Sequence, residues 1–92
     1  MSWTVKFNRK SNNDFEALTK AQKLEILALI EELQEDGPAI AGAIQLRSNQ
    51  NTWAVRFDNA RYRMIYEVSK AKRQIILSRM QPRGVVYKGL RG

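Results

Sequence analysis

The hydrophobic pattern of this chain changes its period once, about halfway along the sequence. Between Thr19 and Asp36, apolar side chains recur at intervals of three and four residues, which is the spacing of one face of a helix. From Trp53 to Met80, apolar residues largely alternate with polar ones, as in strands that bury one face. Runs of helix followed by runs of strand are typical of the α+β class, in which helices cover one side of a sheet.

The start of the chain predicts a strand followed by a helical hairpin. Residues 3–7 alternate apolar and polar side chains, which indicates a strand with one buried face. Helix-capping residue types gather at 11–14 and predict a short helix over 15–18. Thr19 and Gln22 then stand at the spacing of a capping box, which predicts the start of a longer helix.

The longer helix has a broad apolar face, and Gly37 marks its end. The apolar face consists of Leu24, Ile26, Leu27, Leu29, Ile30 and Leu33. The glutamates of the same segment are expected on an opposite, solvated face. Residues 39–46 are small and apolar, and they fit either a short helix or a packed loop. Residues 47–51 are polar and predict an exposed loop.

Three strands are expected in the second half, over residues 53–57, 60–68 and 74–80. A final short helix is expected from about Pro82 to Leu90. The complete order is β-α-α-β-β-β(-α). We therefore predict an α+β fold, with residues 1–92 as a single domain, in which the helical hairpin packs on a small, mostly antiparallel sheet.

The connection between the first two of these strands decides which side chains meet on the sheet. If Asp58 and Asn59 form a two-residue turn, Arg56 lies directly across from Arg61, and Arg63 shares their face. The alternate positions then face the core, among them Trp53, Tyr62, Met64 and Tyr66. Like charges opposite each other destabilise a sheet, unless an anion lies between them or the side chains diverge into water. The sequence leaves both possibilities open.

Charge is divided unevenly along the chain. The net charge is +7, but residues 1–46 carry five basic and seven acidic side chains, whereas residues 47–92 carry eleven basic and only two acidic ones. Most of those eleven are arginines, whose planar guanidinium matches the oxygens of a phosphate. The second half is therefore predicted to bind a polyanion, with RNA contacts at Arg47, Arg61, Arg79, Gln81 and Lys88.

The residue types that are missing exclude several kinds of chemistry. The chain has no histidine and no cysteine, and no pair of carboxylates lies near the basic segment, since Asp58 is in a turn and Glu67 stands alone. No metal and no cofactor is expected, so catalysis would depend on arginine and tyrosine. We find no apolar run of membrane-spanning length and no signal-peptide pattern, and we expect a cytoplasmic location and no membrane partner.

Three segments of the second half resemble the RelE family, which belongs to the RelE/ParE superfamily of toxin–antitoxin toxins. They are residues 61–68 (RYRMIYEV), 75–77 (IIL) and 83–87 (RGVVY). The order of elements is similar over the whole chain, and the motifs over about its last forty residues. The resemblance implies an endoribonuclease that cuts messenger RNA in the ribosomal A site. In that reaction, the 2′-hydroxyl of the RNA attacks the neighbouring phosphate.

Matching the family's motifs implies four catalytic residues: Arg56, Arg63, Arg83 and Tyr87. Arg63 takes the place of the catalytic arginine on the middle strand, and Tyr87 that of the carboxy-terminal tyrosine. Two positions depart from the pattern: Ala54 replaces a lysine and Gln81 replaces an arginine. Arg79 precedes Gln81 by two residues and is expected to supply part of the lost charge.

The resemblance also implies partners, namely a cognate antitoxin protein, the ribosome and messenger RNA. Two other functions remain open. The first is inhibition of DNA gyrase in the manner of ParE toxins, without nuclease activity; Ala54 and Gln81 favour it, and Arg63 with Tyr87 disfavours it. The second is RNA binding without catalysis.

Overall fold

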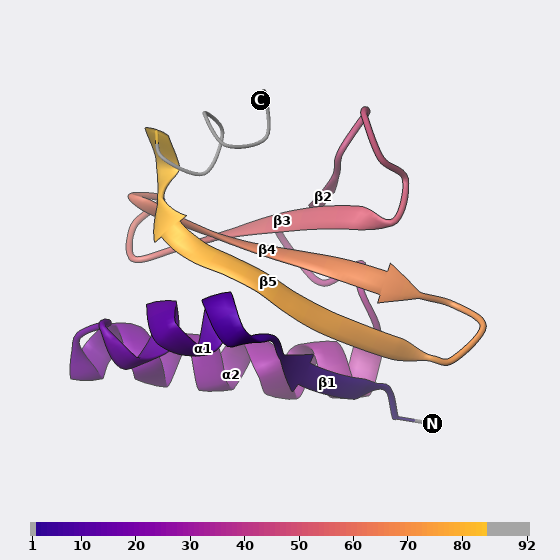
Figure 1. Cartoon of the computed structure of the whole chain (residues 1–92), viewed down its shortest axis with the longest axis horizontal. Helices are drawn as coiled ribbons and strands as arrows, with labels where there is room; N and C mark the ends of the chain where they lie inside the picture. Colours follow the sequence, from indigo (N-terminus) through magenta and orange to yellow (C-terminus); the bar gives the residue numbers. More distant parts are fainter. Residues whose placement is uncertain (1, 85–92) are drawn as a thin grey trace.

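The computed structural model describes residues 2–84, which form two helices and a five-stranded sheet (Figure 1). The elements are β1 (Thr4–Phe7), α1 (Arg9–Glu16), α2 (Lys20–Asp36), β2 (Ile44–Gln45), β3 (Thr52–Phe57), β4 (Tyr62–Ser69) and β5 (Gln74–Pro82). The strand order is β1-β5-β4-β3-β2; β1 is parallel to β5, and the other pairs are antiparallel. The predicted α+β fold is confirmed, with both helices on one face of the sheet.

Helix α1 begins earlier than the sequence predicts. Asn8 is its N-cap: the Asn8 side chain accepts a hydrogen bond from the backbone N–H of Ser11, and the Ser11 hydroxyl accepts one from the backbone N–H of Asn8. Residues 11–14 therefore lie inside the helix and do not precede it, so that prediction was wrong. The sequence signal was ambiguous because serine and asparagine cap helices from several positions, and the buried Ser11 acts at the third helical residue.

Helix α2 has the predicted limits but a narrower buried face. Thr19 and Gln22 form the expected capping box, and Gly37 follows the last turn. Ile26 and Leu33 are completely buried, whereas Leu24 and Leu27 are exposed. The predicted apolar face is therefore broader than the part of it that is buried. A small sheet covers only one side of a helix, so the apolar positions beyond that side remain in water.

The chain leaves α2 through a conformation that requires glycine. Gly37 has a φ of 84° and a ψ of −167°, a backbone conformation that residues other than glycine rarely adopt. A Cβ at this position would lie 2.9 Å from the indole nitrogen of Trp3. The chain then turns at residues 41 and 42 and forms the short edge strand β2, so residues 39–46 are neither a helix nor only a loop.

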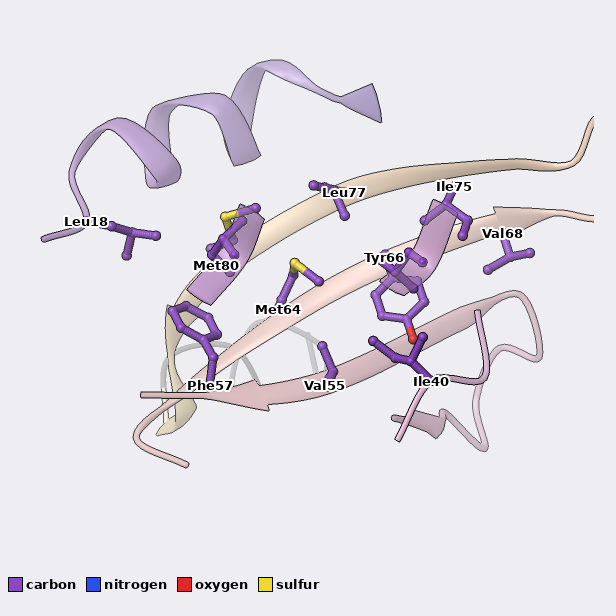
Figure 2. Packing of buried hydrophobic residues seen from close by; sticks show 12 residues of the cluster. Leu18, Ile40, Val55, Phe57, Met64, Tyr66, Val68, Ile75, Leu77 and Met80 are labelled. Carbon is purple, nitrogen blue, oxygen red and sulfur yellow. The ribbon is translucent and has the colours of Figure 1, made fainter. Parts of the chain in front are cut away.

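The core lies between the helices and the sheet (Figure 2). Its sheet side is built from the predicted alternate positions, including Val55, Met64 and Tyr66, and α2 contributes Ile26 and Leu33. Trp53 and Tyr62 pack against this cluster at its margin. The Tyr66 hydroxyl donates a hydrogen bond to the carbonyl of Pro38, and burial raises the pKa of that hydroxyl well above its usual range. Tyr66 is thus a structural residue, as the sequence predicts.

One extra residue in β5 changes which of its side chains face the core. Ile65 pairs with Arg79 but the next residue, Tyr66, pairs with Leu77, which leaves Ser78 as a bulge. Because of this bulge, Leu77 and Met80 are both buried although they are three residues apart. Strict alternation from Leu77 would have placed residues 79 and 81 inside. The bulge instead places Gln81 on the face of the sheet opposite the helices.

None of the helices within residues 2–84 is both long enough and apolar enough to cross a membrane. The predicted terminal helix, from about Pro82 to Leu90, falls almost entirely outside the described residues, and Pro82 itself is the last residue of β5.

Candidate active site on the open face of the sheet

Three of the predicted site residues lie in one row across the sheet. Arg56 of β3 pairs with Arg63 of β4, and Arg63 pairs with Gln81 of β5. Their neighbours Val55, Met64 and Met80 point into the core, so the row faces the side of the sheet opposite α1 and α2, which we call the open face. Side chains at directly opposite positions have Cβ atoms about 5 Å apart, close enough to contact one phosphate group together.

The hairpin between β3 and β4 has a longer loop than the sequence predicts. Its four residues are 58–61, and Phe57 pairs with Tyr62. Asp58, Asn59 and Ala60 adopt positive φ values of 53°, 54° and 68°. The predicted pairing of Arg56 with Arg61 was wrong, and Arg63 takes that place. The register differs by two residues, which preserves the faces of the strands, and so the predicted division into core and open face still holds.

Arg63 is held in a defined orientation. Its side chain is buried, with only 6% exposed, and its Nη1 donates hydrogen bonds to the carbonyls of Ala60, at 2.9 Å, and Tyr62, at 3.3 Å. Both acceptors belong to the β3–β4 loop or to its junction with β4. A guanidinium that is held by carbonyl groups has a defined direction before any anion arrives, so binding costs little side-chain freedom.

A shallow pocket of about 160 Å³ opens beside this row. It is lined by Gly42, Ile44, Ala54, Arg56 and Arg63. Ala54 is buried together with Ile65, and Leu46 packs against them. The lining of the pocket thus combines two arginines with small and apolar residues. The small Ala54 side chain leaves space where the RelE-family pattern has a lysine.

Two further arginines lie at the same end of the sheet, near the β3–β4 loop. Arg61 is exposed, and its Nη2 forms an ion pair with the Asp58 carboxylate at 3.0 Å. The backbone N–H of Arg83 donates a hydrogen bond to the Arg61 carbonyl at 3.0 Å, and this residue is also exposed. Neither belongs to the row formed by Arg56, Arg63 and Gln81, and their predicted RNA-binding and catalytic roles stay predictions.

Arg79 forms an ion pair with Asp14 of α1. Its Nε lies 2.9 Å from the carboxylate of Asp14 in α1, and the same carboxylate accepts a hydrogen bond from the backbone N–H of Met80 at 2.9 Å. Asp14 therefore covers the edge of β5 beyond the end of β1. The charge of Arg79 is turned toward α1, which argues against the predicted substitution for the missing arginine at Gln81.

Three predicted site residues remain, one described and two outside the described residues. Arg47 is exposed in the β2–β3 loop, which joins β3 at the end opposite Arg56. Tyr87 and Lys88 lie outside the described residues, and their roles stay predictions.

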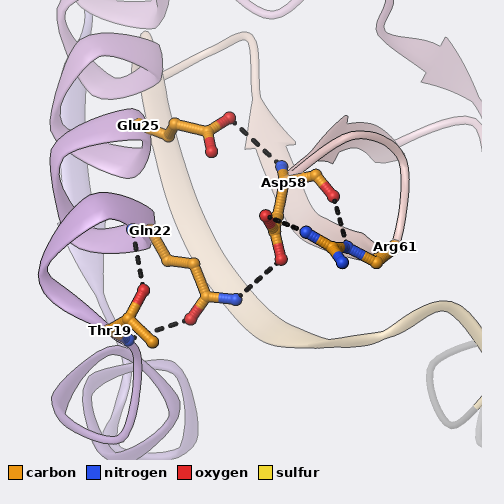
Figure 3. A network of polar contacts seen from close by, with 5 residues as sticks. All are labelled: Thr19, Gln22, Glu25, Asp58 and Arg61. Carbon is orange, nitrogen blue, oxygen red and sulfur yellow. Dashed lines mark hydrogen bonds and ion pairs between the residues drawn. The ribbon is translucent and has the colours of Figure 1, made fainter.

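The sequence did not reveal a polar network behind the loop (Figure 3). The Asp58 carboxylate accepts a hydrogen bond from Nε2 of Gln22 at 2.9 Å, and the Asp58 backbone N–H donates one to the Glu25 carboxylate at 3.1 Å. The Gln22 hydrogen bond, followed by the one from Arg61, lowers the pKa of Asp58 below its usual 3.8. The capping box pointed to Gln22, but its contact with a residue 36 positions away had no sequence signal.

Solved toxin structures share this architecture. A double arginine-to-alanine variant of the Escherichia coli toxin RelE in the free state superposes with a TM-score of 0.80; the two sequences are 17% identical, and the match covers 96% of this chain and 93% of that one. The chain has the fold of RelE toxins. No family model matches the sequence, and no curated protein matches it significantly.

Other proteins with the RelE fold come from distant organisms. The archaeal RelE–RelB complex from Pyrococcus horikoshii matches with a TM-score of 0.74 and 23% identity, over 91% of this chain and 98% of that one. A YoeB/ParE toxin from Agrobacterium tumefaciens matches with a TM-score of 0.72 and 23% identity, over 86% and 96%. The RelE-like fold is thus retained although fewer than a quarter of the residues are identical.

Proposed function

We propose that this chain is the toxin of a toxin–antitoxin pair and that it cleaves messenger RNA on the ribosome. The observation that carries this proposal is the row of Arg56, Arg63 and Gln81 beside a pocket on the open face of a RelE-like fold. A basic surface with a pocket, on the side of the sheet opposite α1 and α2, is suited to an extended polyanion. A ribosomal substrate would place the protein in the cytoplasm.

The proposed reaction is an in-line displacement at phosphorus. The 2′-hydroxyl oxygen of one nucleotide forms a bond to the adjacent phosphorus, and the bond from that phosphorus to the 5′-oxygen breaks. The products are a 2′,3′-cyclic phosphate and a 5′-hydroxyl, so one proton leaves the 2′-oxygen and one is taken up by the 5′-oxygen. Such a reaction depends on positioning and on stabilisation of negative charge, both of which arginine provides.

Each residue of the row has a distinct part in this scheme. Arg63, fixed by two carbonyls, binds a non-bridging oxygen, and the exposed Arg56 binds the same group from the neighbouring strand. Gln81 donates a hydrogen bond but adds no charge, so transition-state stabilisation is weaker than with a third arginine. Proton exchange is assigned to Tyr87 on the resemblance alone.

A protein antitoxin is the proposed partner. Several structures with this fold are complexes of RelE with RelB, described as toxin–antitoxin complexes. An antitoxin that covers the open face of the sheet would block access of RNA to Arg56 and Arg63.

The decisive experiment incubates the purified protein with ribosomes programmed with a defined message and maps the cut ends. We expect cleavage that leaves cyclic phosphate ends, loss of cleavage in Arg63→Ala and Tyr87→Phe, and faster cleavage in Gln81→Arg. An intact message with the parent protein would overturn the nuclease proposal.

Inhibition of DNA gyrase is the second candidate, because Ala54 and Gln81 remove two charges from the positions that the nuclease pattern requires. A supercoiling assay with gyrase, run beside the cleavage assay, separates the two functions. Inhibition of supercoiling by the parent and by Arg63→Ala alike, without RNA cleavage, would favour this candidate.

A further inference from the structure

The β3–β4 loop is held in a conformation that its own sequence does not favour. Three consecutive residues, Asp58 to Ala60, have positive φ, and the third of them is alanine, which rarely adopts such values. Backbone of this kind persists only where the surrounding contacts determine it. Two of the contacts that hold this loop come from the first turns of α2, on the helical side of the molecule (Figure 3).

Gln22 uses both ends of its amide. Its Oε1 accepts a hydrogen bond from the backbone N–H of Thr19 at 2.9 Å, which completes the cap of α2. Its Nε2 donates to the Asp58 carboxylate at 2.9 Å. The side chain is buried, with 7% exposed. Because the cap fixes the oxygen of the amide, the nitrogen has a defined direction, toward the loop.

Glu25, one turn further along α2, contacts the backbone of the same loop residue, Asp58. Its carboxylate accepts a hydrogen bond from the Asp58 N–H at 3.1 Å. Asp58 is thus bound at its side chain by Gln22 and at its main chain by Glu25. Arg61 closes the loop on the other side through its ion pair with Asp58.

The loop in turn fixes Arg63. The carbonyl of Ala60, the last of the three left-handed residues, accepts the hydrogen bond from Nη1 of Arg63 at 2.9 Å. The direction of that carbonyl depends on the backbone angles of the loop. A chain of contacts therefore runs from the cap of α2, through Asp58 and Ala60, to the guanidinium in the central row of the open face.

We propose that Gln22 is a positioning residue for RNA cleavage, because through Asp58 it sets the loop conformation in which the Ala60 carbonyl orients Arg63. The catalytic consequence rests on the proposed nuclease function, whereas the orientation of Arg63 does not. The side chain of Gln22 lies on the helical side of the sheet and contacts no RNA.

Gln22 has two roles, the cap of α2 and the hydrogen bond to Asp58, and only a residue with both an acceptor and a donor can fill them. Glutamate completes a capping box as well as glutamine does, because a carboxylate accepts a hydrogen bond from the N–H of Thr19. It cannot, when ionised, donate to Asp58, and it would repel the Asp58 carboxylate. The Gln22→Glu variant therefore keeps the helix cap and removes the connection to the loop.

The test measures ribosome-dependent cleavage by the parent, Gln22→Glu and Gln34→Glu at a temperature where all three are folded. Gln34 is an exposed glutamine of the same helix, so its variant has the same change of charge. We expect Gln22→Glu to lower kcat about tenfold with little change in KM, since a misplaced group affects the transition state more than binding. Gln34→Glu should match the parent.

A conservative rescue distinguishes positioning from general weakening of the fold. Asp58→Asn keeps an acceptor for Gln22 and tolerates positive φ, and it should retain most of the parent kcat. Asp58→Ala loses the acceptor and should resemble Gln22→Glu. A parent-like kcat in Gln22→Glu, or equal losses in Asp58→Asn and Asp58→Ala, would overturn the proposal.

The side-chain NMR signal of Arg63 gives a readout that does not depend on cleavage. The Nε–Hε resonance of Arg63 should shift in Gln22→Glu and remain in place in Gln34→Glu. If the parent does not cleave RNA, the nuclease proposal fails, and this resonance still decides whether Gln22 orients Arg63. An unchanged resonance in Gln22→Glu refutes the positioning role.

Discussion

Ala60 illustrates how the site depends on single backbone conformations. It is an alanine with a φ of 68°, between the left-handed Asn59 and the exposed Arg61, and its carbonyl holds the guanidinium of Arg63. Asparagine and aspartate tolerate this region because their side chains hydrogen-bond locally, whereas alanine gains nothing from it. The strain at Ala60 is therefore stored next to the residue that the site uses, and the contacts of Asp58 with α2 maintain it.

Replacing Ala60 by a β-branched residue should expose this strain. Ala60→Val is expected to lower the free energy of unfolding by about 1–2 kcal/mol, because a branched Cβ worsens the clash at positive φ. Ala60→Gly should lie within about 1 kcal/mol of the parent, since relief of strain offsets the greater entropy of the unfolded chain. Denaturant unfolding measures both. Ala71→Val, at an exposed turn position without positive φ, is the control, and an equal loss there would contradict the explanation.

Asp58 gives the site a defined response to acid. Hydrogen bonds from Gln22 and Arg61 lower the pKa of its carboxyl below 3.8, while the unfolded chain has an ordinary aspartate pKa of about 3.9. A lowered pKa in the folded state stabilises the fold above the unfolded pKa, and this contribution is lost as the pH falls through the folded value.

The stability difference between the parent and Asp58→Asn should therefore be constant at pH values above about 5 and shrink below about 4. The groups around Asp58 are Gln22, Glu25 and Arg61, of which only Glu25 also titrates in acid, and it is present in both proteins. Thermal unfolding across this range measures the difference. A difference that grows on acidification would show that Asp58 is not held as its carboxylate.

At the scale of elements, α1 and β5 are joined by Asp14, which bonds both the side chain of Arg79 and the backbone of Met80. The contact covers a stretch of sheet edge that β1 is too short to reach. A strand edge without a partner is a site of unwanted pairing, and a partly buried carboxylate that accepts a hydrogen bond from its N–H is one way to protect it. Arg79 thus contributes to stability through α1.

Asp14→Ala should lower the free energy of unfolding by about 1–2 kcal/mol, because it removes the acceptor of three hydrogen bonds, two from Arg79 and one from Met80. Arg79→Ala should cost less, about 0.5 kcal/mol, since Asp14 keeps its bond to Met80 and the ion pair is partly exposed. Both follow from urea unfolding curves. Cleavage by the folded Arg79→Ala protein should stay near the parent rate; nearly complete loss would instead support the sequence-based expectation that Arg79 replaces the missing charge.

Most elements were predictable from the sequence, because their signals are local. The capping box of Thr19 and Gln22 and the alternation along β3 and β4 each lie within a few residues. The bulge at Ser78 and the four-residue loop were not predictable, because tertiary contacts decide them. The faces of Arg56 and Arg63 could be predicted, since a register shift of two residues preserves them. The diversion of Arg79 to Asp14 could not, because the two residues are 65 positions apart.

At the scale of the whole molecule, the two layers of the fold carry different charge. The helices belong to the half of the chain in which acidic side chains outnumber basic ones, and the sheet is built mainly from the strongly basic half. On the proposed function, RNA would approach the open face of the sheet, and the helices lie on the opposite side (Figure 1).

Affinity for single-stranded RNA should accordingly fall steeply with salt, and each phosphate contact that is removed should reduce the slope. Arg56→Ala is expected to lower the slope of log K against log salt by about 0.7, the value for one contact to a single strand. Lys20→Ala, at the exposed start of α2, should leave the slope unchanged. Fluorescence anisotropy over a range of salt concentrations measures this, and equal effects of the two variants would show that charge acts without regard to the face that carries it.

The hydrogen bond from Gln22 to Asp58 joins the two halves of the chain. The half that carries the positive charge is therefore not the half from which we propose that Arg63 is oriented. On the proposed function, the basic half carries the net positive charge that would attract RNA, and the contact that we propose to orient its Arg63 comes from the acidic half. A separated hairpin of β3 and β4 would keep its guanidinium groups and lose the anchor that gives them direction. If the protein cleaves RNA as proposed, substitutions in α2 that contact no nucleotide would change the cleavage rate and leave the affinity for RNA unchanged.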